Sequence, residues 1–245
     1  MDLGISGRTA IVCGSSSGIG HACARALAAA GVSVIINGRR EAPLADAAKA
    51  IAEHTGNAVQ AIVADVATAE GRATLLAACH DPDILINNAA GPPVGSWRDF
   101  DETAWYDALR ISMISPIELT RSVLDAMIAR RWGRIVNITS SATKAPLPML
   151  GLSNGARSGL TGYVAGLARE VAAFGVTINN LLPGKIETDR LRSYARAVVG
   201  NGDLSAAIDV IASEIPAGRV GRPEEMGAYC AFLASEHAGF VTGQY

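Results

Sequence analysis

The sequence predicts a single-domain α/β fold in which helices cover both faces of a parallel sheet. Short β-branched runs, almost continuously apolar, alternate along the chain with alanine-rich segments of helical period. Such runs are typical of strands buried on both faces, and strands separated by helices pair in parallel through right-handed crossovers. The chain of 245 residues is 49% hydrophobic and contains no linker or internal repeat, which favours one sizeable core over residues 1–245. The predicted architecture is therefore doubly wound and of Rossmann type.

The predicted strands are the runs rich in valine and isoleucine. In chain order they cover residues 9–12, 32–36, 59–63, 84–86, 135–138 and 176–182. The predicted helices are the stretches between and after these runs in which apolar residues recur at helical spacing. They cover residues 18–30, 43–54, 72–79, 103–130 and 153–174. A last helix is expected to begin at Pro223, because proline suits the first helical positions and Glu224 and Glu225 complement the helix dipole.

The charge balance excludes several classes of partner. There are 21 basic and 23 acidic side chains, a formal net charge of −2 and a pI of about 6.1. No basic surface therefore indicates binding to nucleic acid or to anionic lipid. No apolar stretch approaches the roughly 18 residues that cross a bilayer, and the first residues carry no basic-then-apolar export signal. We expect a cytoplasmic protein with a small-molecule substrate and no membrane or nucleic-acid partner.

The cysteines and histidines predict neither disulfides nor a metal site. No two cysteines form a CxxC pair, and the histidines show no spacing typical of metal ligands. Widely spaced single cysteines are typical of reduced core thiols in a cytosolic protein. The residues concerned are Cys13, Cys23, Cys79, Cys230, His21, His54, His80 and His237.

A glycine-rich segment joins the first predicted strand to the first predicted helix. Glycine allows the backbone to turn tightly and to approach a pyrophosphate, and the amides at the start of a helix stabilise an anion. An ordinary Gly/Ser turn has the same composition, but the position directly between strand and helix favours a phosphate loop. The residues expected to bind phosphate are Gly14, Ser16, Ser17, Gly18, Ile19 and Gly20.

The end of the second predicted strand indicates which dinucleotide is bound. The strand runs into Gly38, Arg39 and Arg40, where an NAD enzyme usually places a carboxylate for the ribose 2′-hydroxyl. A carboxylate would repel a 2′-phosphate, whereas a guanidinium attracts it through paired hydrogen bonds. Two solvated arginines at a strand end are a common alternative. The sequence nevertheless favours NADP(H), with Arg39 as the 2′-phosphate ligand.

Four motifs in register resemble the short-chain dehydrogenase/reductase family, and in particular its 3-oxoacyl-carrier-protein reductases. They are the phosphate loop, Ala64-Asp65-Val66, Asn87-Asn88-Ala89-Ala90 and the segment from Pro183 to Asp189. The match covers essentially the whole chain.

The resemblance implies a role for each matching position. Asp65 and Val66 would contact the adenine, and Asn88 and Ala89 would pack along the cofactor ribose. The nicotinamide and its amide would be held by Pro183, Gly184, Ile186 and Thr188. Cys13 stands where threonine is usual in the family and Ala90 where glycine is usual, and neither change removes an amide donor.

The family's catalytic set is only partly present. The resemblance places Ser140, at the end of a strand, in the role of the serine that holds the substrate oxygen. Ser140 and the Gly159-Leu160 pair fix the alignment with the family on both sides of this segment. In that alignment Ser153 occupies the position of the family's tyrosine, and Arg157 that of its lysine. Ser112 likewise occupies the position of the family's asparagine. An aliphatic hydroxyl is far less acidic than a phenol, so Ser153 is a poor general acid.

Other side chains are candidates for moving the proton. Arg157 keeps a positive charge and five donors, so ribose binding is expected to survive, but a guanidinium does not readily release a proton. We favour Lys185, which lies in the predicted nicotinamide loop and would become a better acid when desolvated. Lys144 and Tyr194 are alternatives, and Tyr163 is expected to pack in a core or interface. A solvated lysine or a packing tyrosine is the commoner role for such residues.

A substrate lid is predicted over about residues 185–216. Long irregular segments at the carboxyl edge of a sheet often shape a substrate pocket, and Gly200 to Asp203 would form its flexible turn. Its apolar lining would be Leu191, Tyr194, Val198, Val199 and Ile208. The apolar and small-residue faces of the helices at 103–130 and 153–174 indicate a homo-oligomer, a tetramer or a dimer.

Two functions remain open at this point. The first is an NADP(H)-dependent oxidoreductase with an atypical catalytic set, acting on a small or acyl-type carbonyl or on an activated double bond. The second is a catalytically silent NADP-binding subunit that regulates or stabilises a partner. Ser140, the nicotinamide loop and the lid favour the enzyme, whereas the missing tyrosine and lysine favour the silent subunit.

Overall fold

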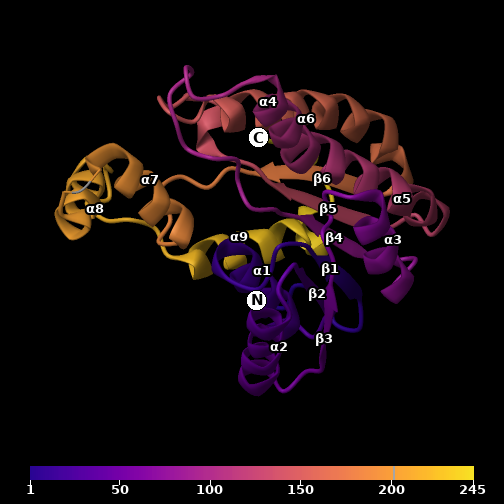
Figure 1. Cartoon of the computed structure of the whole chain (residues 1–245). Coiled ribbons are helices and arrows are strands. Elements are labelled where there is room, and N and C mark those ends of the chain that lie inside the picture. Colours follow the sequence, from indigo (N-terminus) through magenta and orange to yellow (C-terminus); the bar gives the residue numbers. More distant parts are fainter. Residues whose placement is uncertain (201) are drawn as a thin grey trace.

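A computed structural model describes residues 1–200 and 202–245 of the chain. Its centre is a six-stranded sheet in the order β3-β2-β1-β4-β5-β6, with every neighbouring pair parallel (Figure 1). The strands are β1 (Thr9–Val12), β2 (Ser33–Gly38), β3 (Val59–Val63), β4 (Ile84–Asn87), β5 (Gly133–Ile138) and β6 (Val176–Leu181). The predicted fold class is therefore confirmed, and β1 and β4 flank the point at which the strand order reverses.

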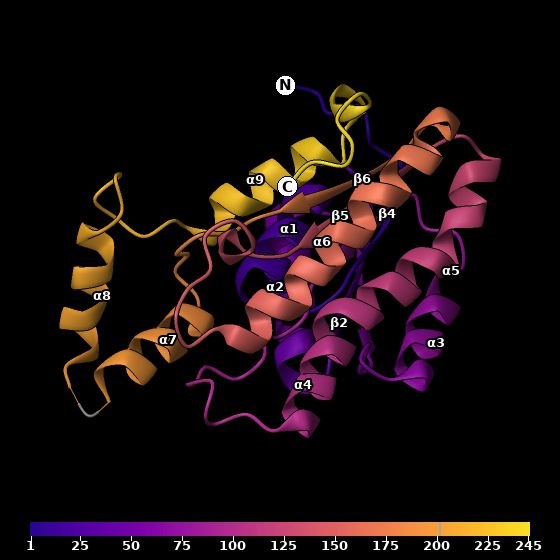
Figure 2. The same ribbon diagram turned by 90° about the horizontal axis from the view of Figure 1, so that it is seen from above.

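Helices cover both faces of this sheet. They are α1 (Gly18–Ala29), α2 (Glu41–Thr55), α3 (Ala69–Ala78), α4 (Glu102–Leu109), α5 (Ser115–Ala129), α6 (Gly151–Val171), α7 (Asp189–Val199), α8 (Leu204–Ser213) and α9 (Pro223–Leu233). One apolar core joins the sheet to α1, α2 and α9, and a second joins its other face to α3, α5 and α6 (Figures 1 and 2). The two cores hold the sheet rigid between two helical layers.

The strand β3 departs from the prediction of strands buried on both faces. Gln60, Ala61 and Val63 are exposed. The strand lies at the margin of the sheet and has only β2 as a neighbour, so the helical layers cover it incompletely. An apolar run thus identified the strand but not its place at the edge.

The single long helix predicted at 103–130 is wrong in one respect. A π-helical turn, Arg110–Ile114, separates α4 from α5 and contains Ser112. Pro116 has no N–H and cannot donate to the Ser112 carbonyl as a regular α-helix requires. The Ser115 N–H donates instead to the Arg110 carbonyl, which widens the turn.

The predicted lid is helical and not irregular. Figures 1 and 2 show α7 and α8 standing apart from the sheet and its two helical layers. Asp203 begins α8 by accepting hydrogen bonds from the N–H groups of Ser205 and Ala206. Of the predicted flexible turn from Gly200 to Asp203, Asn201 lies outside the described residues.

The last residues of the chain run beside β6. The Asn180 N–H donates to the Gln244 carbonyl at 2.9 Å, and the Gly243 N–H donates to the Ile178 carbonyl at 2.9 Å. No helix in the described part of the chain is both long and apolar enough to cross a membrane.

Candidate functional site

A large cavity opens at the carboxyl ends of the strands. Its volume is about 1190 Å³, and the segments that follow all six strands contribute to its walls. Of the residues assigned from the sequence to the cofactor and to the main catalytic set, all but Gly20 and Ser112 line it. Those that line it are Gly14, Ser16, Ser17, Gly18, Ile19, Arg39, Asp65, Val66, Asn88, Ala89, Ser140, Ser153, Arg157, Pro183, Gly184, Lys185, Ile186 and Thr188.

The glycines of the predicted phosphate loop are required by the backbone. Gly14 and Gly18 have φ values of 56° and 59°, in the left-handed region that favours glycine. A Cβ at Gly20 would lie 2.3 Å from the Gly14 carbonyl oxygen and 2.7 Å from Asn88 Nδ2. Gly20 therefore acts by allowing α1 to pack against the loop, which explains why it does not line the cavity.

Side chains that the sequence analysis did not select hold the loop in place. Ser15 Oγ donates to the Val12 carbonyl at 2.7 Å and accepts from the Asn37 N–H at 2.9 Å. Asn37 Nδ2 in turn donates to the Ala64 carbonyl at 3.0 Å. Asn88 Nδ2 donates to the Gly14 carbonyl at 2.9 Å. The ends of four strands are thus tied into one rigid rim around the start of α1.

This rim fits an anionic dinucleotide. The N-terminus of α1 points its amides at the cavity, and Ser17, at its start, makes no side-chain capping bond, so these amides are left for a ligand. Arg39 is exposed at the rim, where its guanidinium can reach a ligand phosphate. The fit rests on this combination of an uncapped helix start, close-packed glycines and a cation.

His21 also lines the cavity, which the sequence analysis did not anticipate. Burial lowers its pKa below the usual value, and the charge of Arg25 lowers it further. Its Nδ1 is buried and has no hydrogen-bond partner among the described residues. The sequence feature that could have identified His21 as a cavity residue is its position directly after Gly20, on the first turn of the helix that follows the loop.

Ser140 and Ser153 lie at the other end of the cavity. Ser140 Oγ accepts a hydrogen bond from the Ala142 N–H at 3.1 Å, so its own hydroxyl proton is left to donate. Ser153 lies in the first turns of α6 and its residue is only 5% exposed. Both hydroxyls can therefore face a small ligand while the surrounding backbone stays fixed.

Arg157 is buried one turn further along α6. Its Nη1 donates to the Ile138 carbonyl at 2.7 Å and also to the Thr139 carbonyl, whereas its buried Nε has no partner among the described residues. Burial and the nearby charge of Arg190 lower its pKa to about 10. Arg157 therefore remains a cation at neutral pH and holds the end of β5.

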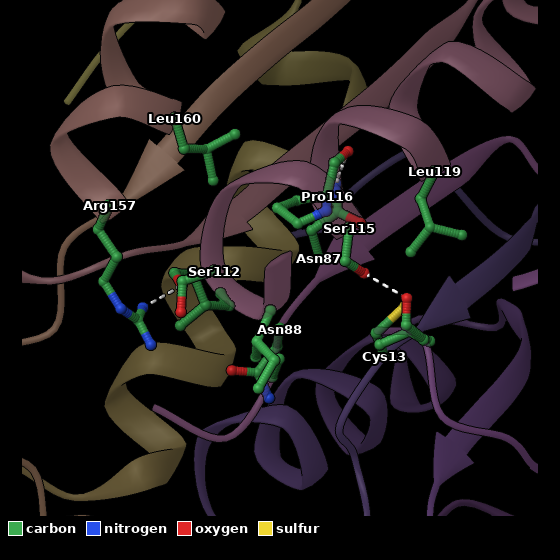
Figure 3. Close-up of a pocket in the computed structure, with 13 residues that line it drawn as sticks. Cys13, Asn87, Asn88, Ser112, Ser115, Pro116, Leu119, Arg157 and Leu160 are labelled. Carbon is green, nitrogen blue, oxygen red and sulfur yellow. Dashed lines mark hydrogen bonds between the residues drawn. The ribbon is translucent and has the colours of Figure 1, made fainter. Parts of the chain in front are cut away.

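A second, small cavity lies behind Arg157. Its volume is about 20 Å³, and Ser112, Arg157 and Asn88 contribute to its walls (Figure 3). Ser112 Oγ is buried and has no hydrogen-bond partner in the described part of the chain. The structure thus brings Ser112 close to Arg157 but not into the large cavity, because the π-helical turn directs it inward.

Lys185 lies between the sheet and α7. Its Nζ is 3.7 Å from the centroid of the Tyr194 ring, and burial lowers its pKa from 10.5, opposed by the charge of Glu214. Lys144 lies 5.1 Å from the Tyr245 ring and does not line the cavity. Tyr163 packs on the core beneath α6. Of the candidate proton donors, Lys185 and Tyr194 are the two that line the cavity.

Arg190 is a cavity residue that the sequence analysis missed. Its Nη1 donates to the Pro92 carbonyl at 2.6 Å. Its guanidinium lies over Gly91, where an added Cβ would be 3.0 Å from Cζ. Its position two residues after Thr188, in the loop already assigned to the nicotinamide, was the available signal.

The predicted apolar lining of the lid is only partly correct. Leu191 and Tyr194 line the cavity. Val198 is 56% exposed, and neither it nor Val199 or Ile208 lines the cavity, because α7 turns its later residues away from the sheet. The described residues include no cluster of three or more His, Cys, Asp or Glu side chains placed to hold a metal ion.

The sequence of this chain is similar to those of known reductases. The short chain dehydrogenase family matches residues 8–198. The 3-oxoacyl-[acyl-carrier-protein] reductase FabG of Haemophilus influenzae is 34% identical over 245 residues, covering 98% of this chain and 95% of that protein. The enzyme of the same name from Escherichia coli is 33% identical, covering 99% of this chain and 96% of its own.

Solved structures agree with this relationship. L-sorbose reductase from Gluconobacter frateurii, complexed with NADPH and L-sorbose, superposes with a TM-score of 0.92 at 30% identity over 100% of this chain and 95% of its own. A 3-oxoacyl (acyl-carrier-protein) reductase from Agrobacterium tumefaciens with NADP bound gives a TM-score of 0.89 at 32% identity, covering 99% and 93%.

Proposed function

Because this chain belongs to the short chain dehydrogenase family, we propose that it is an NADP(H)-dependent oxidoreductase acting on a small or acyl-type carbonyl, or on an activated double bond. The observation that carries the proposal is the single cavity that joins the phosphate loop and Arg39 to Ser140. Solved relatives hold NADPH or NADP. The catalytic set proposed for this chain is Ser140, Ser153, Arg157, Ser112 and Lys185.

The cofactor would be held along the rim of the strands. The loop from Gly14 to Gly20 would bind the pyrophosphate, and Arg39 the 2′-phosphate. Bound there, NADPH would supply a hydride to an electrophilic carbon. The positions proposed for the adenine, ribose and nicotinamide are Asp65, Val66, Asn88, Ala89, Arg157, Pro183, Gly184, Ile186 and Thr188.

Ser140 would orient the substrate. Its hydroxyl is held by the Ala142 N–H and can donate to a carbonyl oxygen. A donor fixed before the reaction lowers the cost of developing negative charge on that oxygen. Ser153 would offer a second hydroxyl, too weakly acidic to supply the proton itself.

Lys185 would supply the proton. Burial lowers its pKa, which makes the ammonium a stronger acid than a solvated lysine. The ring of Tyr194 holds the ammonium at the cavity wall. Arg157 would serve as a fixed positive charge and not as a proton donor.

A silent NADP-binding subunit is the second candidate function. Tyr194 is the one tyrosine among the described residues that line the cavity, and its ring is engaged with Lys185. A partner chain would then provide the chemistry.

Turnover and binding measurements discriminate the two functions. NADPH binding is followed by fluorescence titration, and NADPH oxidation is assayed with ketones, quinones and enoyl thioesters. We expect binding and turnover, with turnover lost in Ser140→Ala and kept in Ser122→Ala, a control on the exposed side of α5. Binding without any turnover would favour the silent subunit, and absence of binding would refute both.

The oligomeric state is a separate proposal. Trp105 and Tyr106 on α4 are 40% and 64% exposed, and α4 contacts α6. We propose that this region pairs with a second copy in a dimer or tetramer, to be checked by light scattering of the full chain.

A further inference from the structure

Three cations lie at the substrate end of the large cavity. Arg157, Lys185 and Arg190 all line it. None of them has a carboxylate within 4.0 Å among the described residues, whereas the neighbouring Arg192 lies 3.9 Å from Glu187. Unpaired cations at the wall of a cavity are unusual, because burying a charge without a partner is costly.

Arg190 is held in a fixed position. Its Nη1 donates to the Pro92 carbonyl at 2.6 Å, and the absence of a side chain at Gly91 lets the guanidinium lie against the backbone there. Burial lowers the pKa of Arg190 below the ordinary value for arginine. A guanidinium has five N–H donors, so several remain after the bond to Pro92, on a group that cannot easily swing away.

Arg157 adds to the positive field. Its Nε is buried and has no partner in the described part of the chain, and its pKa responds to the charge of Arg190. Figure 3 shows its guanidinium on the side of Ser112, and its Nη1 donates to the Ile138 carbonyl at the end of β5. Two guanidinium groups that repel one another are stabilised when an anion binds within reach of both.

The anionic parts of the cofactor do not account for these cations. The pyrophosphate and the 2′-phosphate are assigned to the loop at α1 and to Arg39, which follow β1 and β2. Arg190 follows β6 and contacts the segment after β4. The unpaired charge therefore faces the same cavity as Ser140 and Ser153, where the substrate would be.

We propose that Arg190 binds the carboxylate of the substrate, so that the protein reduces a small oxo acid whose carbonyl oxygen lies at Ser140. The proposal rests on the proposed function and names its substrate class. A planar guanidinium binds a carboxylate through two parallel hydrogen bonds. In the reaction the carbonyl C=O becomes C–OH: the carbon gains the hydride, the oxygen gains a proton, and NADPH is oxidised to NADP⁺.

An acid and its methyl ester test the proposal. Acetoacetate and methyl acetoacetate carry the same ketone, but only the first has a carboxylate. We expect kcat/KM of the full-length protein to favour acetoacetate by about tenfold or more, as a charge-assisted bidentate contact allows. Arg190→Met should remove that preference while sparing the ester, and Arg190→Lys should retain part of it.

The matched control is Arg196→Met. Arg196 lies on the same helix, is exposed and does not line the cavity, so the substitution removes the same charge without touching the site. Its preference for acetoacetate should equal that of the unmodified protein. An equal loss in both variants would mean that only the overall charge matters, and would overturn the proposal.

A binding measurement provides a readout besides activity. Butyrate and butyramide are titrated by calorimetry into the protein with and without NADP⁺. Butyrate should bind more tightly than butyramide, and Arg190→Met should abolish the difference. Equal affinities would overturn the proposal.

Loss of the carboxylate site and loss of oxidoreductase activity give different experimental results. If NADPH binds and the ester is reduced as efficiently as the acid, only the carboxylate site is refuted and the oxidoreductase stands. If NADPH neither binds nor is oxidised with any substrate, the proposed function is refuted, and the butyrate titration without NADP⁺ still decides whether Arg190 binds a carboxylate.

Discussion

The two ends of the large cavity are built in different ways. At the loop end the ligand surface is backbone, and its supporting side chains are paired: Ser15, Asn37 and Asn88 all make hydrogen bonds to main-chain groups. At the substrate end the surface is made of side chains. The buried Nε of Arg157 there, and the Oγ of Ser112 in the small cavity behind it, have no partner among the described residues.

This difference separates what is fixed from what is adaptable. A backbone cradle depends on glycine spacing and tolerates few changes, whereas a side-chain surface can change its ligand by substitution at a few positions. Unpaired buried polar atoms cost free energy in the empty protein, and they are stabilised when a ligand supplies the missing partner. We therefore expect substitutions at the loop end to abolish binding and those at the substrate end to change selectivity.

The largest effect is expected for Gly20→Ala. The added Cβ would lie 2.3 Å from the Gly14 carbonyl oxygen, so the loop or α1 must shift. Overpacking of this kind costs about 3 kcal/mol, which corresponds to about 100-fold weaker NADPH binding if it falls on the loop. Fluorescence titration measures the affinity, and circular dichroism confirms that the fold is retained.

Gly162→Ala is the matched control for that substitution. It also lies within a helix, α6, but an added Cβ there meets nothing within 4 Å. NADPH affinity should be unchanged and thermal stability slightly higher, because alanine favours a helix by about 0.5–1 kcal/mol over glycine. Undiminished NADPH binding by Gly20→Ala would contradict the rigid cradle.

At the substrate end, Lys185→Arg tests the proton donor. General acid catalysis contributes about 100-fold or more, so kcat for carbonyl reduction should fall by about that factor although the positive charge is kept. In the unmodified protein kcat should decrease as the pH rises through the pKa of Lys185, since the ammonium is then lost. Because burial lowers that pKa below 10.5, the decrease should begin at a lower pH than for a solvated lysine.

The pH profile of the variant supplies the control. Arginine stays protonated throughout the accessible range, so the alkaline decrease should disappear in Lys185→Arg. An unchanged kcat with an unchanged profile would exclude Lys185 as the donor and leave Tyr194 as the next candidate at the cavity wall.

Arg39→Ala should change cofactor selectivity at the loop end. Removal of a guanidinium from a phosphate costs about 2 kcal/mol, or about 30-fold in NADPH affinity. The NADH affinity of the same variant is the internal control and should not change. Equal losses of affinity for NADPH and NADH would mean that Arg39 supports the loop and does not bind the 2′-phosphate.

The loop end could be predicted from the sequence because backbone geometry dictates residue type there. Positive φ at Gly14 and Gly18 and the close approach at Gly20 each require glycine. The spacing of the glycines in the sequence therefore indicates the conformation of the loop. The alternation of apolar runs and helical segments likewise predicted a parallel sheet with helices on both faces, since strands joined by crossover helices permit few topologies.

The substrate end could not be predicted to the same degree. Arg190 becomes a cavity residue only because β6 and β4 bring it over Gly91, and no local pattern encodes that contact. The π-helical turn at Ser112 and the start of α8 in the predicted lid depend on single residues, Pro116 and Asp203. A single residue is a weaker signal in a sequence than a repeated apolar pattern.

The smallest effect is expected for Gly91→Ala, which alters the backbone position next to Arg190 at the substrate end. In Gly91→Ala the new Cβ would lie 3.0 Å from Arg190 Cζ, so the guanidinium must move by a few tenths of an ångström, which it can do because it is the end of a flexible chain. We expect the preference for acetoacetate over its methyl ester to fall by about threefold, since paired hydrogen bonds depend on geometry.

The control for that substitution is Gly166→Ala on α6, where an added Cβ meets nothing within 4 Å; it should keep the full preference. NADPH affinity should stay constant in both variants. If Gly91→Ala instead reduced turnover of acid and ester equally, Gly91 would serve the cofactor and not Arg190. A selective loss for the acid would show that a backbone position sets the charge selectivity of the adaptable end.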